Sequence, residues 1–111
     1  LRNHGVLYAG PHGWRLSPAY DLNPVPIDVK PRVLTTTITV DHDPTASLEM
    51  ALEVAGDFAL KPSAAKAVVR EVGQATATWR KAAARLGFKQ AEIERMATAF
   101  EHEDARKAGA R

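Results

Sequence analysis

Apolar and polar positions alternate near the start of the chain. Val6, Leu7 and Tyr8 are good strand formers. Residues 14–17 (Trp-Arg-Leu-Ser) alternate apolar and polar, which is the period of a half-buried strand. Between them, residues 10–13 (Gly-Pro-His-Gly) have the composition of a tight turn. The pattern therefore predicts a β-hairpin.

A proline-rich stretch follows. Pro18 ends the second strand, because proline cannot donate to a β-ladder. Residues 19–31 contain three more prolines, a density that excludes a helix and predicts an extended loop. Residues 34–40 (Leu-Thr-Thr-Thr-Ile-Thr-Val) are β-branched, so they form either a short edge strand or an extended segment laid over a core.

From residue 43 onward the apolar spacing changes to steps of three and four, which is the period of a helix. Asp43 and Pro44 suit the N-cap and first position of a helix that Gly56 ends. The apolar positions of this helix are Leu48, Ala51, Leu52 and Ala55.

Two further helices are predicted. One runs from Pro62 to Leu86 and is closed by Gly87, with its apolar side formed by Val68, Val69, Val72, Ala75, Trp79, Ala82 and Leu86. The other covers residues 90–103, with Ile93, Met96, Ala97 and Phe100 on its buried side. Residues 104–111 are charged and alanine-rich, and we expect them to fray.

The predicted fold class is mainly α: an N-terminal β-hairpin and a proline-rich loop, followed by about three packed helices. We expect one domain over residues 1–111, with the hairpin and loop in residues 1–40 and the helical part in residues 43–104. A length of 111 residues suits a single domain. Trp79 is expected in the core and Trp14 is expected to cover the hairpin against the helices.

Composition narrows the function classes. The chain has no cysteine, which excludes disulfides and thiolate metal sites and fits the reducing cytoplasm. No apolar run reaches the roughly 20 residues that span a bilayer. The net charge of +2 comes from mixed signs and gives little support for a nucleic-acid-binding stripe. We expect solvated outer helix faces for the basic residues Lys66, Arg70, Arg80, Lys81, Arg85, Lys89 and Arg95.

Several common site patterns are absent from the sequence. The glycines are scattered singly, so there is no glycine-rich phosphate loop. The four histidines lack metal-ligand spacing. His42 lies between Asp41 and Asp43, an arrangement that could bind a divalent ion, but we interpret it as a solvated loop leading into a helix cap.

One pair of residues suggests chemistry. Asn3 immediately precedes the predicted hairpin and Asp21 follows its second strand, so the hairpin should bring them together. An amide oxygen and a carboxylate suit Mg²⁺, which takes one or two carboxylates plus phosphate oxygens. The alternative is that both residues hydrogen-bond their own backbone beside turns, as Asn and Asp commonly do.

The run from Trp14 to Pro24 (Trp-Arg-Leu-Ser-Pro-Ala-Tyr-Asp-Leu-Asn-Pro) resembles the segment around the metal-binding Asp of HipA-like serine/threonine protein kinases. The opening Leu-Arg-Asn-His-Gly resembles the end of that family's catalytic loop, and residues 36–58 are also similar. The resemblance implies metal-binding roles for Asn3 and Asp21. It implies a supporting role for Tyr20, which packs to orient Asp21, and places Asn23 at the start of an activation-loop-like region. Arg2 falls where a basic residue is common.

Because these proteins are kinases, the resemblance implies Mg²⁺ and ATP as cofactors in a longer parent protein. They are also the toxins of bacterial toxin–antitoxin modules. The resemblance also implies an antitoxin partner, DNA contacted indirectly through that antitoxin, and a protein substrate phosphorylated on Ser or Thr. In the family, the general base, the ATP-binding Lys and the N-terminal lobe precede the part that matches Leu1. The chain also starts without Met. We therefore expect a C-terminal fragment with no catalytic residue, no bound cofactor and no activity of its own.

Two further expectations follow. A surface exposed by truncation, in the hairpin and in residues 34–40, should be apolar and favour a dimer. The alternative function is a small helical interaction module that docks an antitoxin or nucleic acid through basic helix faces. In that case Asn3 and Asp21 would point apart.

Overall fold

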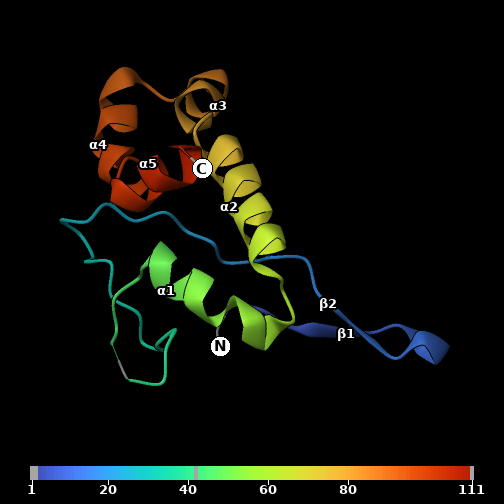
Figure 1. Cartoon of the computed structure of the whole chain (residues 1–111). Coiled ribbons are helices and arrows are strands. Elements are labelled where there is room, and N and C mark those ends of the chain that lie inside the picture. The colour runs from blue at the N-terminus through green and yellow to red at the C-terminus, as the bar shows by residue number, and fades with distance from the viewer. Residues whose placement is uncertain (1–2, 42, 111) are drawn as a thin grey trace.

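The computed structural model describes residues 3–41 and 43–110, and Figure 1 shows a helical body with a β-hairpin projecting from it. The hairpin pairs β1 (Val6–Tyr8) with β2 (Trp14–Leu16) in antiparallel register, through the 3-10 turn η1 (Gly10–His12). Gly10 and Gly13 adopt φ of +63° and +80°, a region that glycine enters without strain. The predicted hairpin is confirmed.

The register gives the hairpin one wholly apolar face. Val6 pairs with Leu16 and Tyr8 with Trp14, so these four side chains share a face, whereas Leu7 and Arg15 lie on the other. The rings of Tyr8 and Trp14 contact each other with centroids 5.4 Å apart. We call these four residues the hairpin face.

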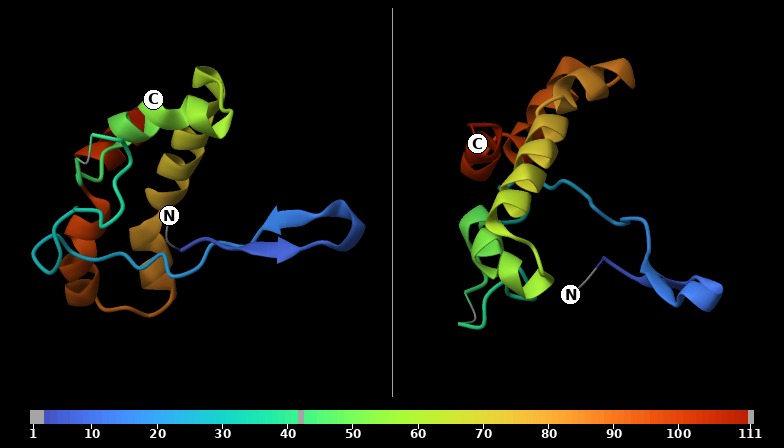
Figure 2. Two further views of the ribbon diagram at one scale, coloured as in Figure 1. Left: turned by 90° about the horizontal axis from the view of Figure 1, so that it is seen from below. Right: turned by 45° about the vertical axis from the view of Figure 1, so that its right-hand side comes forward.

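The hairpin face does not pack on the helices. The hairpin points away from them in every view (Figures 1 and 2), and Trp14 is 68% exposed. The prediction that Trp14 covers the hairpin against the helices is therefore wrong. The expected apolar exposure of the hairpin is confirmed.

Residues 17–41 and 43–47, between β2 and the first helix, form an irregular connection. Its local order is an isolated antiparallel bridge between Val33 and Thr45, flanked by a backbone hydrogen bond of 2.7 Å from Leu34 to Pro44. Residues 34–40 form neither an edge strand nor a straight extended segment, because the backbone bends at residues 35–36 and 38–39 and turns at residue 40. Val40 is 96% exposed, while Leu34 and Ile38 are half-buried.

The first helix, α1 (Leu48–Glu53), begins later than predicted. Its N-cap is Ser47, whose hydroxyl accepts from the Met50 amide at 3.4 Å. The predicted cap, Asp43, instead accepts from the Thr45 amide at 2.8 Å, a local Asx turn that competes with helix formation. Gly56 does not end the element, because the 3-10 helix η2 (Val54–Phe58) continues the chain to Ala59 in left-handed conformation.

The predicted helix over residues 62–86 is two helices, α2 (Pro62–Thr76) and α3 (Trp79–Arg85). At the break, the Thr76 hydroxyl donates to the Val72 carbonyl at 2.9 Å and the Thr78 hydroxyl to the Ala75 carbonyl at 2.8 Å. These hydroxyls compete with the backbone for helix acceptors. Gly87, with φ of +88°, closes α3 as predicted.

Two more helices complete the chain. The expected last helix is α4 (Gln90–Phe100), and the residues expected to fray form α5 (Glu103–Ala110) against α2. A Cβ atom placed on Gly73 would lie only 2.8 Å from the Ala108 Cβ, so α2 and α5 meet at glycine. The prediction of a frayed tail is wrong because Gly73 permits this close contact.

The core is small. Among the described residues, the buried hydrophobic side chains are Ala55, Ala65, Ile93 and Ala108. Trp79, expected in the core, is half-buried and stacks on Phe100 with ring centroids 4.5 Å apart. Val68 and Val72, predicted on the buried side, are exposed, because α2 turns Ala65 and Gly73 inward.

The shape reflects this layout. The radius of gyration is 16.1 Å, whereas a compact domain of this length has about 13 Å. The predicted mainly α class is confirmed. Among the described residues, no helix has the length and apolar character needed to cross a bilayer.

Candidate functional site

Asn3 and Asp21 are in contact where the two arms of the hairpin meet the body. The Asn3 side-chain nitrogen donates to the Asp21 backbone carbonyl at 3.0 Å. The pairing of the arms continues beyond the strands, since the Ser17 amide donates to the Gly5 carbonyl at 2.8 Å. The expected proximity of Asn3 and Asp21 is therefore present, and their role as metal ligands stays a prediction.

Both residues have left-handed backbone conformations. The φ angle is +59° at Asn3 and +54° at Asp21. Asn and Asp are among the few residues other than glycine that adopt this region at low cost.

Neighbouring side chains hold the junction. Asn23 donates from its side-chain nitrogen to the Asp21 carboxylate at 2.5 Å, so it fixes that carboxylate directly. The Tyr20 hydroxyl donates to the His4 backbone carbonyl at 2.9 Å. Tyr20 thus ties together the two segments that carry Asn3 and Asp21, and its contact is with the backbone and not with the carboxylate.

An open pocket of about 670 Å³ adjoins this pair. Asn3 and Asp21 contribute to its lining, together with the loop and the end of the first helical segment. The other lining residues are Lys30, Val33, Leu34, Thr35, Thr36, Thr37, Ile38, Ala51, Val54 and Phe58. In the sequence, the threonines stand out only as β-branched residues and Lys30 does not stand out at all, because neither has a periodic pattern that marks a site.

The proline-rich loop that supplies this lining is fastened to the helices at several points. The Ile27 amide donates to the Thr98 hydroxyl at 3.3 Å, and Asp28 pairs with Arg95 on α4 at 3.0 Å. The hydrogen bond from Arg95 lowers the pKa of Asp28. The proline-rich loop is therefore held against α4.

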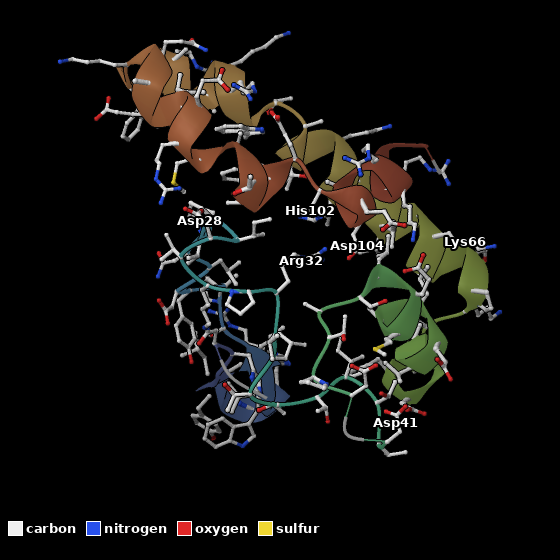
Figure 3. The ribbon with its side chains drawn as sticks, turned by 90° about the vertical axis from the view of Figure 1, so that its left-hand side faces the viewer. Asp28, Arg32, Asp41, Lys66, His102 and Asp104 are labelled. Atoms are coloured by element: carbon white, nitrogen blue, oxygen red, sulfur yellow. The ribbon has the colours of Figure 1, made fainter. Side chains whose placement is uncertain are left out.

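A second fastening lies at α5. Arg32 forms an ion pair with Asp104 and donates to the Ala46 carbonyl at 2.9 Å. Figure 3 shows Arg32 reaching from the loop toward His102 and Asp104. The His102 side chain accepts from the Ala105 amide at 3.3 Å, and burial, followed by the charge of Arg32, lowers the pKa of His102.

The donor set at Asn3 and Asp21 fits a magnesium ion that also has phosphate and water ligands. It offers one carboxylate and one amide oxygen, and the Asn3–Asp21 hydrogen bond uses the amide nitrogen and not the oxygen. An all-protein cage is not what Mg²⁺ requires. Residues 3–41 and 43–110 contain no cluster of three or more His, Asp or Glu side chains arranged for a metal. His42, from the Asp41–Asp43 cluster, and Arg2 lie outside the described residues.

Two of the basic residues expected on solvated helix faces are engaged in ion pairs. Arg80 contacts Glu94 at 2.7 Å and Glu101 at 2.5 Å and lies over the Trp79 ring, and the carboxylates raise its pKa further. Arg95 pairs with Asp28. Acidic side chains therefore interrupt the basic surface of α3 and α4.

Comparison with known proteins gives one match. The model of a protein family described as the HipA-like C-terminal domain matches residues 1–102. The matched region contains the hairpin, the Asn3–Asp21 junction, the whole pocket lining and α1 to α4, and it stops just before α5. Neither the curated proteins nor the solved structures include a match.

Proposed function

The chain belongs to the family of HipA-like C-terminal domains, and we propose that it supplies the metal-holding part of a serine/threonine protein kinase. The HipA family is generally related to such kinases. In the complete protein, the kinase transfers phosphate from ATP to Ser or Thr of a protein and acts in the cytoplasm as the toxin of a toxin–antitoxin pair. Its partners are that protein substrate and the antitoxin, with DNA reached through the antitoxin.

One observation carries this proposal: Asn3 and Asp21, 18 residues apart, are in contact and line the same open pocket. The Asp21 carboxylate and the Asn3 amide oxygen would hold Mg²⁺, whose charge offsets that of the triphosphate. Asn23 fixes the orientation of the carboxylate, and Tyr20 fixes the spacing of the two segments. Phosphoryl transfer depends mainly on positioning and charge, so we expect the hydrogen bonds of Asn23 and Tyr20 to increase the rate of the transfer step.

The general base and the ATP-binding Lys belong, under this proposal, to parts of the complete protein outside these 111 residues. The domain alone would therefore not transfer phosphate. The interaction-module alternative receives less support. It requires Asn3 and Asp21 to point apart and the helices to present a continuous basic face, whereas Glu94 and Glu101 interrupt that face.

The test is ATP-dependent phosphorylation by the complete protein, wild type against Asp21→Asn. Asparagine keeps the size of the side chain and tolerates left-handed backbone, while it removes the charge. We expect activity to fall by about 100-fold or more, as when one electrostatic group is removed from an active site.

The matched control is Asp57→Asn, the same change at an exposed residue outside the pocket lining. It should leave activity unchanged. An Asp21→Asn protein that is folded and as active as wild type, or a wild type inactive with every nucleotide tried, would contradict the proposal.

A further inference from the structure

The pocket beside Asn3 and Asp21 has a polar part and an apolar part. Asn3, Asp21 and Lys30 provide an amide, a carboxylate and an ammonium group, and three threonines add hydroxyls. Half of the lining residues are apolar, and they come from the loop and from the first helical segment. We call these residues the apolar wall: Val33, Leu34, Ile38, Ala51, Val54 and Phe58.

Backbone contacts hold the two sides of the apolar wall together. The bridge between Val33 and Thr45 places the loop side next to the start of α1. A hydrogen bond of 2.7 Å from the Leu34 amide to the Pro44 carbonyl supports this bridge. Ser47, the N-cap of α1, follows soon after in the chain. The apolar wall is therefore positioned by backbone hydrogen bonds of the folded domain.

Phe58 is the largest side chain of the apolar wall, and it is 62% exposed. The next residue, Ala59, has a left-handed backbone with φ of +57°, a conformation that is costly for alanine. The Ala59 amide donates to the Gly56 carbonyl at 3.0 Å, which holds this conformation. An exposed aromatic ring is thus fixed in the pocket lining beside strained backbone, a combination that is common at binding sites.

The triphosphate of the proposed reaction accounts only for the polar part of the pocket. Phosphate oxygens and Mg²⁺ require charged or hydrogen-bonding partners, and the apolar wall offers neither. The pocket volume of about 670 Å³ lies within the range of about 300–1,000 Å³ for pockets that hold drug-sized ligands. There is therefore room for a further, apolar group beside the metal and the γ-phosphate.

The protein substrate supplies a group at a suitable distance. Its acceptor hydroxyl must reach the γ-phosphate at the metal, and each residue next to the acceptor has its Cα only about 3.8 Å along the chain. The side chain of such a neighbour therefore enters the same pocket. The base of ATP, by contrast, is separated from the γ-phosphate by the ribose and two further phosphates, so it lies farther from Asn3 and Asp21.

We propose that the apolar wall selects protein substrates in which a large apolar residue stands directly beside the acceptor Ser or Thr. Leu34, Ile38 and Phe58 contact that residue. This inference rests on the proposed function and adds a substrate class to it. Burial of the neighbour against the apolar wall removes apolar surface of both partners from water, whereas a charged neighbour loses its hydration there.

The experiment uses the complete protein, Mg²⁺, labelled ATP and synthetic peptides that differ only at the residues directly before and after a single acceptor serine. At each of these two positions the peptides carry leucine, alanine or aspartate, and kcat/KM for phosphate transfer is measured. We expect leucine to exceed aspartate by at least about 10-fold at one of the two positions, the scale on which hydrophobic pockets discriminate. Alanine should give an intermediate value.

Two variants connect this preference with the apolar wall. Phe58→Ala should lower the ratio of the leucine peptide to the aspartate peptide by at least about 5-fold, because it removes apolar contact area. Phe58→Lys should shift the preference toward the aspartate peptide, and the exposure of Phe58 allows the charge to stay hydrated. Because each result is a ratio between two peptides, a change in the amount of folded protein does not produce it.

The matched control is Phe88→Ala, the same change at a phenylalanine that is 53% exposed and lies outside this pocket lining. The ratio between the two peptides should equal that of the wild type.

The outcomes separate the two proposals. Phosphorylation of all peptides at similar rates, or a leucine preference that both Phe58 variants leave unchanged, overturns this inference and leaves the kinase proposal standing. Failure to release ADP or to transfer phosphate to any peptide or protein removes the kinase proposal and this inference with it.

Discussion

At residue 73, the absence of a side chain decides whether α5 can lie on α2. A Cβ atom at this position would be 2.8 Å from the Ala108 Cβ and 2.9 Å from the Ala108 carbonyl carbon. Such distances require the backbone of α5 to move. The usual gain from replacing a helical glycine by alanine, about 0.5–1 kcal/mol, is therefore reversed here.

We expect Gly73→Ala to lower the free energy of unfolding by about 1–2 kcal/mol, the net of that gain and an overpacking cost of roughly 1–3 kcal/mol. Chemical denaturation followed by circular dichroism measures it. Gly109→Ala in α5 is the control, since a Cβ there has open space, and it should be neutral or stabilising. Equal effects of the two changes would show that α5 does not rest on Gly73.

His102, just before α5, makes the stability of this helix sensitive to pH. Its neutral side chain accepts from the Ala105 amide at the start of α5, and burial and Arg32 lower its pKa below the usual value of 6.5. The unfolded chain therefore binds this proton at a higher pH than the folded chain does. The stabilisation is complete well above pH 6.5 and is lost as the pH falls from there toward the pKa of the folded state.

The measurement is the free energy of unfolding between pH 7.5 and pH 5, for the wild type and for His102→Asn. Asparagine can still cap the helix and does not titrate. We expect the wild type to lose stability relative to the variant as the pH falls. Parallel curves for the two proteins would show that His102 has no such role.

At the scale of elements, the two tryptophans lie in opposite environments although both were expected to pack. Trp79 stacks on Phe100, and its neighbour Arg80 bridges to Glu94 and Glu101, so α3 is joined to α4 by an aromatic and an ionic contact. Trp14 contacts Tyr8 within the hairpin and is otherwise exposed.

We expect Trp79→Ala to reduce the free energy of unfolding by about 2–3 kcal/mol, because it removes a packed aromatic side chain. Trp14→Ala should cost less than about 1 kcal/mol, the scale of a single cross-strand pair. Thermal unfolding of both variants provides the comparison. A larger loss from Trp14→Ala would mean that the hairpin face is covered in solution.

Elements defined by local rules could be predicted, and elements defined by distant contacts could not. The hairpin and the Asn3–Asp21 contact follow from turn composition and the closure of one hairpin. The start of α1 was missed because Asp43 and Ser47 are both good caps, and the choice depends on the Val33–Thr45 bridge and the Asx turn. The break between α2 and α3 depends on threonine hydroxyls within a continuous apolar pattern.

The same distinction holds for α5 and the pocket. Residues 103–110 have no apolar side chain larger than alanine, so no hydrophobic period marks a helix there. The helix is anchored by Gly73, Arg32 and Glu49, which are far away in sequence. Lys30 and the threonines join Asn3 and Asp21 only because the loop returns beside the hairpin base. The Asn3–Asp21 pair could be named from the sequence, but the other residues of the pocket lining could not.

The molecule as a whole is less compact than a typical domain of its length. Its radius of gyration exceeds the compact value, and the hairpin extends away from the helices in Figures 1 and 2. The helical part is held by a few buried residues and by ion pairs between its elements. The position of the loop that lines the pocket therefore depends on its contacts with α4 and α5.

The length of the hairpin strands limits how another surface could cover the hairpin. Strands of three residues leave very few outward-facing amides and carbonyls on each edge, too few to template the addition of another strand. The four large side chains of the hairpin face, by contrast, offer a continuous apolar area. Any surface that shields this hairpin from water would therefore dock flat across that face, through shape and not through backbone pairing.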